Sequence, residues 1–178
     1  MLIHHTQDPQ WMADAYVVAK EAGGPALWID CNGAHDDLHA FVAANDLDVQ
    51  GILLTHHHID HIYDLDEVME RYGVPVGASA RAIELIREDG HYTGPIEYTL
   101  DDDGTFELAG LEIRAIPTPG HAGGHLAFLV DGTDVFTAWG EPATLLVWGP
   151  DYDGGHKALV RWADGSEDVV GGSKVERG

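Results

Sequence analysis

The first half of the chain alternates short apolar runs with amphipathic segments, and this alternation predicts strands that are separated by helices. The apolar runs are rich in β-branched and aromatic residues and are bounded by glycine, proline or aspartate, as strands commonly are. They cover residues 14–19, 26–29, 49–55 and 75–78. Because the run at 26–29 is wholly apolar, we expect that strand to be buried.

Between these runs, apolar residues recur at helical spacing. The segments with this pattern cover residues 35–45, 60–72 and 80–88. We expect the second of them to be one continuous helix that stops at Gly73, and the third to begin with Ser79 as its N-cap. His35 and His39 lie on the first helix, where we expect both to be exposed and not to bind a metal.

The second half changes to alternating apolar and polar residues, which predicts β-hairpins. Two hairpins are expected around glycine-containing turns, and they cover residues 105–116 and 125–138. Weak helical periodicity returns at 157–163, and residues 90–104 and 139–156 are expected to be loops. No linker or low-complexity tract interrupts the chain. We therefore predict a single α/β domain over residues 1–178, with two mixed sheets packed face to face and helices outside.

The charge is strongly acidic, with 31 Asp and Glu against 9 Lys and Arg and a formal net charge of −22. This argues against nucleic acid or an anionic membrane surface as a partner, since both require clustered basic residues. An acidic, lysine-poor surface suits a salt-rich cytoplasm, because salt screens its self-repulsion, so a halophilic source is a hypothesis.

The single cysteine, Cys31, excludes an intramolecular disulfide, and we expect it to be a buried thiol. The N-terminus lacks the basic and apolar regions of a signal peptide, and no apolar run approaches the length of a membrane span. A cytoplasmic protein is predicted.

The stretch 53–61 (LLTHHHIDH) concentrates candidate metal ligands at the end of a predicted strand. Residues two apart at a strand end point to the same side, so His56 and His58 can converge on one ion. Imidazole and carboxylate groups suit zinc, and iron or manganese less selectively. Asp60 and His61, at the start of the next element, could hold a second ion or an attacking water.

A second candidate segment, 118–125 (TPGHAGGH), follows directly on another predicted strand. Its Pro-Gly pair turns the chain sharply and leaves His121 at a loop tip, which makes His121 a candidate third ligand. His125 is expected to play a supporting role at the mouth of the next strand. Asp30 closes a buried strand and needs a partner, so it is either a surface cap or the acceptor for the second N–H of a ligand histidine. Thr55 is assigned a supporting role like that of His125.

These two segments carry a resemblance to a known family. The segment 55–61 matches the His-x-His-x-Asp-His signature of the metallo-β-lactamase-fold hydrolases, and Thr-Pro-Gly-His at 118–121 matches their second ligand motif in the form common among glyoxalase II-like members. The chain resembles this superfamily over about residues 15–138. The resemblance implies an αββα sandwich with metals at one edge. It also implies a first metal held by His56, His58 and His121, and a second to which Asp60 and His61 contribute.

The sequence departs from the family pattern at two ligand positions. Trp139 stands where glyoxalase II-like members have a metal-bridging Asp, and Ser173 stands where they have a last histidine. Glu141 and His156 are possible replacements. The helical C-terminal domain that binds glutathione in glyoxalase II enzymes is not expected in residues 1–178. We therefore expect one zinc ion or an incomplete two-metal site.

The implied activity is hydrolysis of a small molecule. Zinc lowers the pKa of bound water to about 7, and the resulting hydroxide would attack a thioester, ester or lactone-type carbonyl, with Asp60 orienting it and accepting its proton. Two alternatives stay open. A metal-binding protein without turnover, acting in sensing or assembly, is favoured by Trp139 and Ser173. An enzyme like the mononuclear iron persulfide dioxygenases is the other, although that family's iron also needs the missing Asp.

Overall fold

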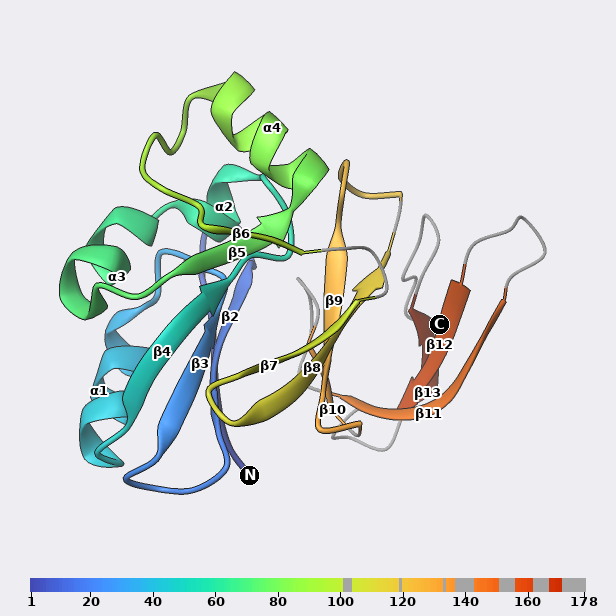
Figure 1. The fold of residues 1–178 in the computed structure, drawn as a ribbon, viewed down its shortest axis with the longest axis horizontal. Coiled ribbons are helices and arrows are strands. Elements are labelled where there is room, and N and C mark those ends of the chain that lie inside the picture. The colour runs from blue at the N-terminus through green and yellow to red at the C-terminus, as the bar shows by residue number, and fades with distance from the viewer. Residues whose placement is uncertain are drawn as a thin grey trace.

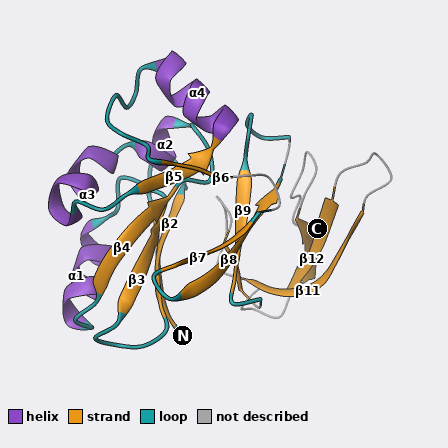
Figure 2. Ribbon diagram, in the orientation of Figure 1, coloured by secondary structure: helices purple, strands orange, loops and turns teal. Residues whose placement is uncertain are grey.

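The computed structural model describes residues 1–100, 104–118, 120–132, 134–136, 143–150, 156–161 and 167–170, with side chains as far as residue 132. Figure 1 shows two β-sheets, with the helices gathered on the outer side of the first. Figure 2 shows the same division between helices and strands. The two-sheet α/β architecture expected from the sequence is confirmed. Within the described residues, no helix has the length and apolar character that crossing a lipid bilayer requires.

The first sheet is mixed, and its strands follow the order β1-β2-β3-β4-β5-β6. They are β1 (Leu2–Gln7), β2 (Asp14–Ala19), β3 (Pro25–Ile29), β4 (Asp48–Leu53), β5 (Val76–Ser79) and β6 (Tyr98–Leu100). The first three strands pair antiparallel, whereas β3 to β6 run parallel. Parallel neighbours need crossover connections, and helices provide them: α1 (Asp36–Ala44), α2 (Ile59–Ile62), α3 (Leu65–Tyr72) and α4 (Ala80–Asp89).

The second sheet has the order β13-β12-β11-β10-β9-β8-β7, and all of its described pairings are antiparallel. Its strands are β7 (Thr105–Leu108), β8 (Leu111–Pro117), β9 (Leu126–Val130), β10 (Asp134–Phe136), β11 (Ala143–Pro150), β12 (His156–Arg161) and β13 (Glu167–Val170). Both predicted hairpins are present, as β7–β8 and β9–β10.

Strand β2 shows how the layers form, because its residues alternate between two buried surfaces. Tyr16 and Val18 pack between the sheets, against apolar residues of β8 and β9. Ala15, Val17 and Ala19 point the other way and pack beneath the helices. Since both faces are covered, all six residues of β2 are buried. The helices contribute Leu38, Val42, Leu65, Val68, Ala82, Ile83 and Ile86 to this outer core.

Several sequence expectations were wrong in detail. The predicted helix at 60–72 is two helices, because the chain between them bonds to the end of β3: the Cys31 N–H donates to the His61 carbonyl at 2.8 Å, and the Asp64 N–H donates to the Cys31 carbonyl at 3.2 Å. The expected helical periodicity at 157–163 falls largely on strand β12. Strand β11 lies within the expected loop at 139–156, β6 lies within that at 90–104, and β1 was not predicted.

Candidate metal centre

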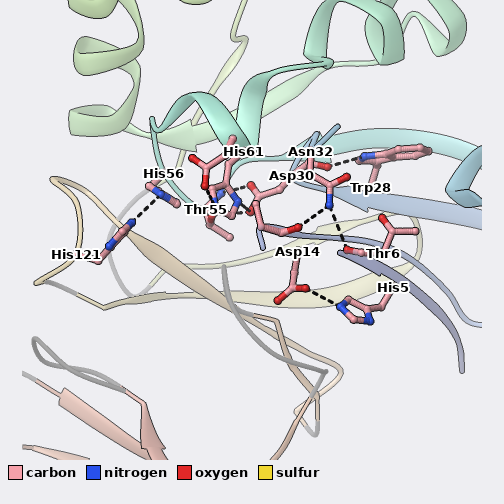
Figure 3. A network of polar contacts seen from close by, with 12 residues as sticks. His5, Thr6, Asp14, Trp28, Asp30, Asn32, Thr55, His56, His61 and His121 are labelled. Atoms are coloured by element: carbon pink, nitrogen blue, oxygen red, sulfur yellow. Dashed lines mark hydrogen bonds and ion pairs between the residues drawn. The ribbon is translucent and has the colours of Figure 1, made fainter. Parts of the chain in front are cut away.

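The two histidine-bearing segments follow strands from different sheets and meet at one edge of the sandwich. His56 comes three residues after the end of β4, and His121 follows β8. The Leu126 N–H, at the start of β9, donates to the Thr55 carbonyl at 2.9 Å, which joins the second sheet to the His56 segment. Figure 3 shows His56 and His121 pointing toward each other from these two sides.

Three imidazoles converge at this edge. One ligand atom from each of His56, His58 and His121 lies within 4.8 Å of the other two. The Nε2 atoms of His56 and His121 are 3.2 Å apart. Two nitrogens bound to one tetrahedral zinc at 2.0–2.1 Å lie about 3.3 Å apart, so this spacing suits a shared ion. His56 is fully buried, His58 is half-buried and His121 is exposed, so the cluster opens toward solvent on the His121 side.

A chain of hydrogen bonds fixes the orientation of the His56 ring. Its Nδ1 lies 3.0 Å from Oγ1 of Thr55, and that hydroxyl donates to Oδ2 of Asp30 at 2.6 Å. With its hydrogen given to the carboxylate, the Thr55 oxygen accepts the Nδ1–H of His56. The proton of His56 therefore sits on Nδ1, and Nε2 keeps the lone pair that a metal needs.

Asp30 is the hub of this network. The residue is fully buried and holds a left-handed backbone with φ of 57°, which is uncommon outside glycine but tolerated by Asp. Its carboxylate accepts from the Thr55 N–H at 2.7 Å, from the Thr55 hydroxyl and from Nδ1 of His61 at 2.9 Å. The Trp28 indole N–H donates to its backbone carbonyl at 2.7 Å. Of the two roles left open by the sequence, the structure places Asp30 behind a candidate ligand histidine and away from the surface.

His61 and Asp60 lie beside the three-histidine cluster. The His61 ring is buried, and its centroid is 4.3 Å from that of His56. Because Nδ1 of His61 faces Asp30, its Nε2 is the nitrogen left for a ligand, and this atom lies 3.6 Å from Oδ2 of Asp60. Asp60 is half-buried. These two residues lie beside the cluster but are not part of the 4.8 Å group, so a second ion or an attacking water at Asp60 and His61 stays a prediction.

His125 supports the loop that carries His121. Its ring is buried, with its centroid 4.8 Å from that of His56, and its Nδ1 contacts the Thr118 hydroxyl. Sequence reasoning missed a second support. The Ser79 hydroxyl, which caps α4 by accepting from the Ala82 N–H, also donates to the Gly124 carbonyl at 2.6 Å. The sequence did indicate Ser79 as the N-cap of α4. It gave no indication that the same hydroxyl would bond to Gly124.

Burial keeps most of these imidazoles neutral. It lowers the pKa values of His56, His58 and His121, and neighbouring histidines add to the effect. Burial also lowers the pKa of His125 to about 3. For His61 burial acts in the same direction, but the Asp30 carboxylate outweighs it, so the pKa of His61 is raised. Neutral imidazoles are the form that binds metals, so the lowered pKa values of His56, His58 and His121 favour binding of a cation.

The remaining sequence candidates are placed only in part. Trp139, Glu141 and Ser173 lie outside the described residues. His156 is the first residue of β12, where its backbone pairs with Pro150 of β11, and its side chain is outside the described part. The possible replacement ligands therefore stay predictions.

The geometry agrees with a comparison of the sequence with known families. The sequence model of the metallo-β-lactamase superfamily matches residues 8–138. The chain belongs to this superfamily. The metallo-β-lactamase assignment confirms the resemblance carried by the two histidine motifs.

Curated relatives agree with the superfamily assignment. A hydroxyacylglutathione hydrolase from Halorhodospira halophila is 32% identical over 123 residues, which are 68% of this chain and 45% of that protein. The probable polyketide biosynthesis zinc-dependent hydrolase BaeB from Bacillus velezensis is 28% identical over 137 residues, 74% of this chain and 59% of that protein. The chain thus spans about half the length of these curated relatives.

Solved structures show the same metallo-β-lactamase fold. ETHE1 from Myxococcus xanthus matches with a TM-score of 0.62 at 23% identity, covering 77% of this chain and 56% of that one. The BLEG-1 B3 metallo-β-lactamase matches with a TM-score of 0.60 at 20% identity, covering 72% and 67%. At these identities the likeness concerns the fold.

Proposed function

We propose that this superfamily member is a metal-dependent hydrolase that cleaves a thioester, ester or lactone-type bond in a small molecule. The observation that carries the proposal is the convergence of His56, His58 and His121, with ligand atoms within 4.8 Å of one another. The superfamily match and relatives that are named as hydrolases support it. One group of relatives is named for hydroxyacylglutathione, so a glutathione thioester is the first substrate to test.

The donor set suits zinc. Three imidazoles with an open fourth position are the ligand arrangement of a catalytic zinc site, although iron or manganese can also bind imidazole and carboxylate. The Nδ1–H of His56 is committed to Thr55, which leaves Nε2 for the ion. When bound, zinc polarises a carbonyl oxygen and makes water acidic enough to ionise near pH 7. Asp60 and His61 would serve a second ion.

The residues of this chain supply position and proton transfer. The hydrogen bonds of Asp30 hold the rings of His61 and, through Thr55, of His56, so these groups need not reorganise during the reaction. The half-buried Asp60 carboxylate faces His61 and can accept a proton from an attacking water. The exposed His121 leaves the approach to the cluster open on its side.

Metal analysis combined with a hydrolysis panel tests this function. The purified chain, stripped and reloaded with zinc, should cleave at least one of a glutathione thioester, an aryl ester and a lactone. His58→Ala and His121→Ala should each lower the amount of bound metal by about one ion per chain relative to the unmodified chain. They should lower kcat/KM by about 100-fold or more, since even removal of a hydrogen-bond partner behind a ligand costs 10–100-fold. His91→Ala is the matched control, because His91 is an exposed histidine outside the cluster.

The alternatives predict different outcomes of the same panel. Stoichiometric zinc without turnover of any substrate would contradict the hydrolase and favour a binding protein, which Trp139 and Ser173 at two family ligand positions make the main rival. Preferential iron binding with sulfite production from a persulfide would instead favour a dioxygenase.

A further inference from the structure

A second group of potential metal ligands lies between α1 and α3, on the outer side of the first sheet. His35 immediately precedes α1, and His39 lies one helical turn later, with its N–H donating to the His35 carbonyl at 3.0 Å. Histidines four apart on a helix share one face, which is the spacing of many helical zinc sites. Glu67 approaches from α3, and its Oε1 lies 3.3 Å from Nε2 of His35.

These three side chains are close enough to share an ion. One nitrogen from each imidazole and one carboxylate oxygen of Glu67 all lie within 4.8 Å of one another. None of the three residues belongs to the His56–His58–His121 cluster, which lies at the strand ends and is built from other elements.

Each histidine already has the supporting partner that metal-bound histidines normally have. Nδ1 of His35 lies 2.6 Å from Oδ2 of Asp64, and Nδ1 of His39 lies 2.8 Å from the Tyr72 hydroxyl. Such contacts fix the tautomer and the ring orientation and leave Nε2 as the ligand atom.

The environment of His39 is the second, independent observation. The residue is 4% exposed, and among the described residues its buried Nε2 has no hydrogen-bond partner. Buried polar atoms nearly always have a partner, which can be protein, an ordered water or an ion, so this nitrogen is available to a ligand. A cation beside Nε2 would satisfy it.

We propose that the Nε2 atoms of His35 and His39 and the carboxylate of Glu67 bind a second divalent cation of the zinc class. Two imidazoles and one carboxylate are a common zinc ligand set, and water completes the coordination. The Glu67 side chain is 62% exposed, which gives the ion a path from solvent. The bound ion links α1 to α3, which stabilises the helical layer. This site requires no hydrolase activity, so it stands whatever the strand-end cluster does.

Zinc binding by the full chain, measured against a competing chelator, tests the second site. The double variant His56→Ala/His121→Ala removes the strand-end cluster and should still bind about one zinc ion per chain, with two imidazoles in the coordination shell by X-ray absorption. In that background Glu67→Gln should weaken binding at least 10-fold, and Tyr72→Phe should weaken it about 10-fold. His39→Gln should abolish stoichiometric binding. Glu70→Gln is the matched control, because Glu70 is an exposed carboxylate on the same helix.

The outcomes separate clearly. Absence of stoichiometric zinc in the double variant, or equal affinities of the Glu67→Gln and Glu70→Gln chains, would overturn the proposal. If the double variant or His39→Gln does not fold, zinc binding by Glu67→Gln in the otherwise unchanged chain tests the proposal. This side chain is exposed, so its substitution does not disturb the core. One of the zinc ions of this variant should bind at least 10-fold more weakly than in the unmodified chain, whereas hydrolysis by the strand-end cluster should persist if that cluster is catalytic.

Discussion

Nδ1 of His61 lies 2.9 Å from the Asp30 carboxylate, although 31 positions separate the two residues. The same carboxylate accepts two hydrogen bonds from Thr55, the residue that precedes His56. One buried side chain therefore fixes both the strand end that carries His56 and the helix that carries His61. The candidate metal centre therefore depends on this carboxylate as well as on the histidines.

Asp30→Asn should weaken zinc binding by about 10–100-fold, because an amide cannot accept from all three donors. It should also lower the free energy of unfolding by about 1–3 kcal/mol, since a buried donor is left without an acceptor. Chelator competition and urea unfolding measure the two effects. Asp14→Asn is the control, because Asp14 is equally buried and bonds to His5 and Gln7. That variant should lose stability while keeping its zinc affinity; a comparable loss of affinity would contradict the role of Asp30.

Gly124→Ala should destabilise the chain more than Gly90→Ala. Both glycines have a φ of +70°, so each alanine incurs the left-handed backbone cost of about 1–2 kcal/mol. At Gly124 the added Cβ would also lie 2.9 Å from the Ala82 nitrogen and too close to the Ser79 hydroxyl, whereas at Gly90 nothing lies within 4 Å. The clash should add about 1–3 kcal/mol.

The Gly124→Ala variant should also bind zinc more weakly, because the loop that carries His121 is held by the bond from Ser79 to Gly124. Urea midpoints and zinc affinity of both variants provide the check. Equal midpoints for the two alanine variants would contradict this prediction. They would show that the loop and α4 move apart enough to accept the added methyl group at little cost.

The metal-free protein should lose stability as the pH falls from about 6.5 toward 4. Burial lowers the pKa of His39 to about 4 and that of His125 to about 3, whereas an unfolded histidine titrates near 6.5. In this window the unfolded chain holds more protons than the folded chain, so the free energy of unfolding falls with pH by about 1.4 kcal/mol per unit for each such proton. His35 and His61, whose pKa values are raised, act in the opposite direction.

Urea unfolding at pH 7.5, 6 and 5 measures this dependence, and His39→Gln should flatten it. A urea midpoint that does not change over this pH range would contradict the prediction. A pH dependence that His39→Gln leaves unaltered would show that His39 takes up its proton in the folded state as readily as in the unfolded chain.

Added salt should raise the stability of the chain. A net charge of −22 on 178 residues creates self-repulsion that favours the unfolded state, and molar salt reduces its range to about 3 Å. The urea midpoint should therefore be higher in molar KCl than in a dilute buffer. A midpoint that is the same in both would remove the support for a halophilic source.

The features that the sequence predicted are those with local causes. Apolar runs that end abruptly placed His56 after a strand, a Pro-Gly turn placed His121 after another, and Ser79 signalled the start of α4. The two motifs together then indicated the fold, which the superfamily match confirmed. Cys31 is buried as expected.

The features that the sequence did not predict depend on contacts between distant segments. His35 and His39 were both expected to be exposed, but His35 is half-buried and His39 is buried. The Trp28 ring of β3 and the Tyr72 hydroxyl of α3 contact His39. The segment near 157–163 has weak helical periodicity, yet residues 156–161 form strand β12 because they pair with β11 and β13. The local pattern of apolar and polar residues does not show which distant segments will contact one another.

The bond from the Leu126 N–H to the Thr55 carbonyl has a mechanical consequence. His56 and His121 arrive from opposite halves of the sandwich, so any opening of the sheets at this end would widen the gap between their nitrogens. An ion bound to both nitrogens would therefore hold the two sheets together at this end. Its removal should make the amide hydrogens of Leu126 and its neighbours exchange faster, while those at the far end of β9 keep their rates.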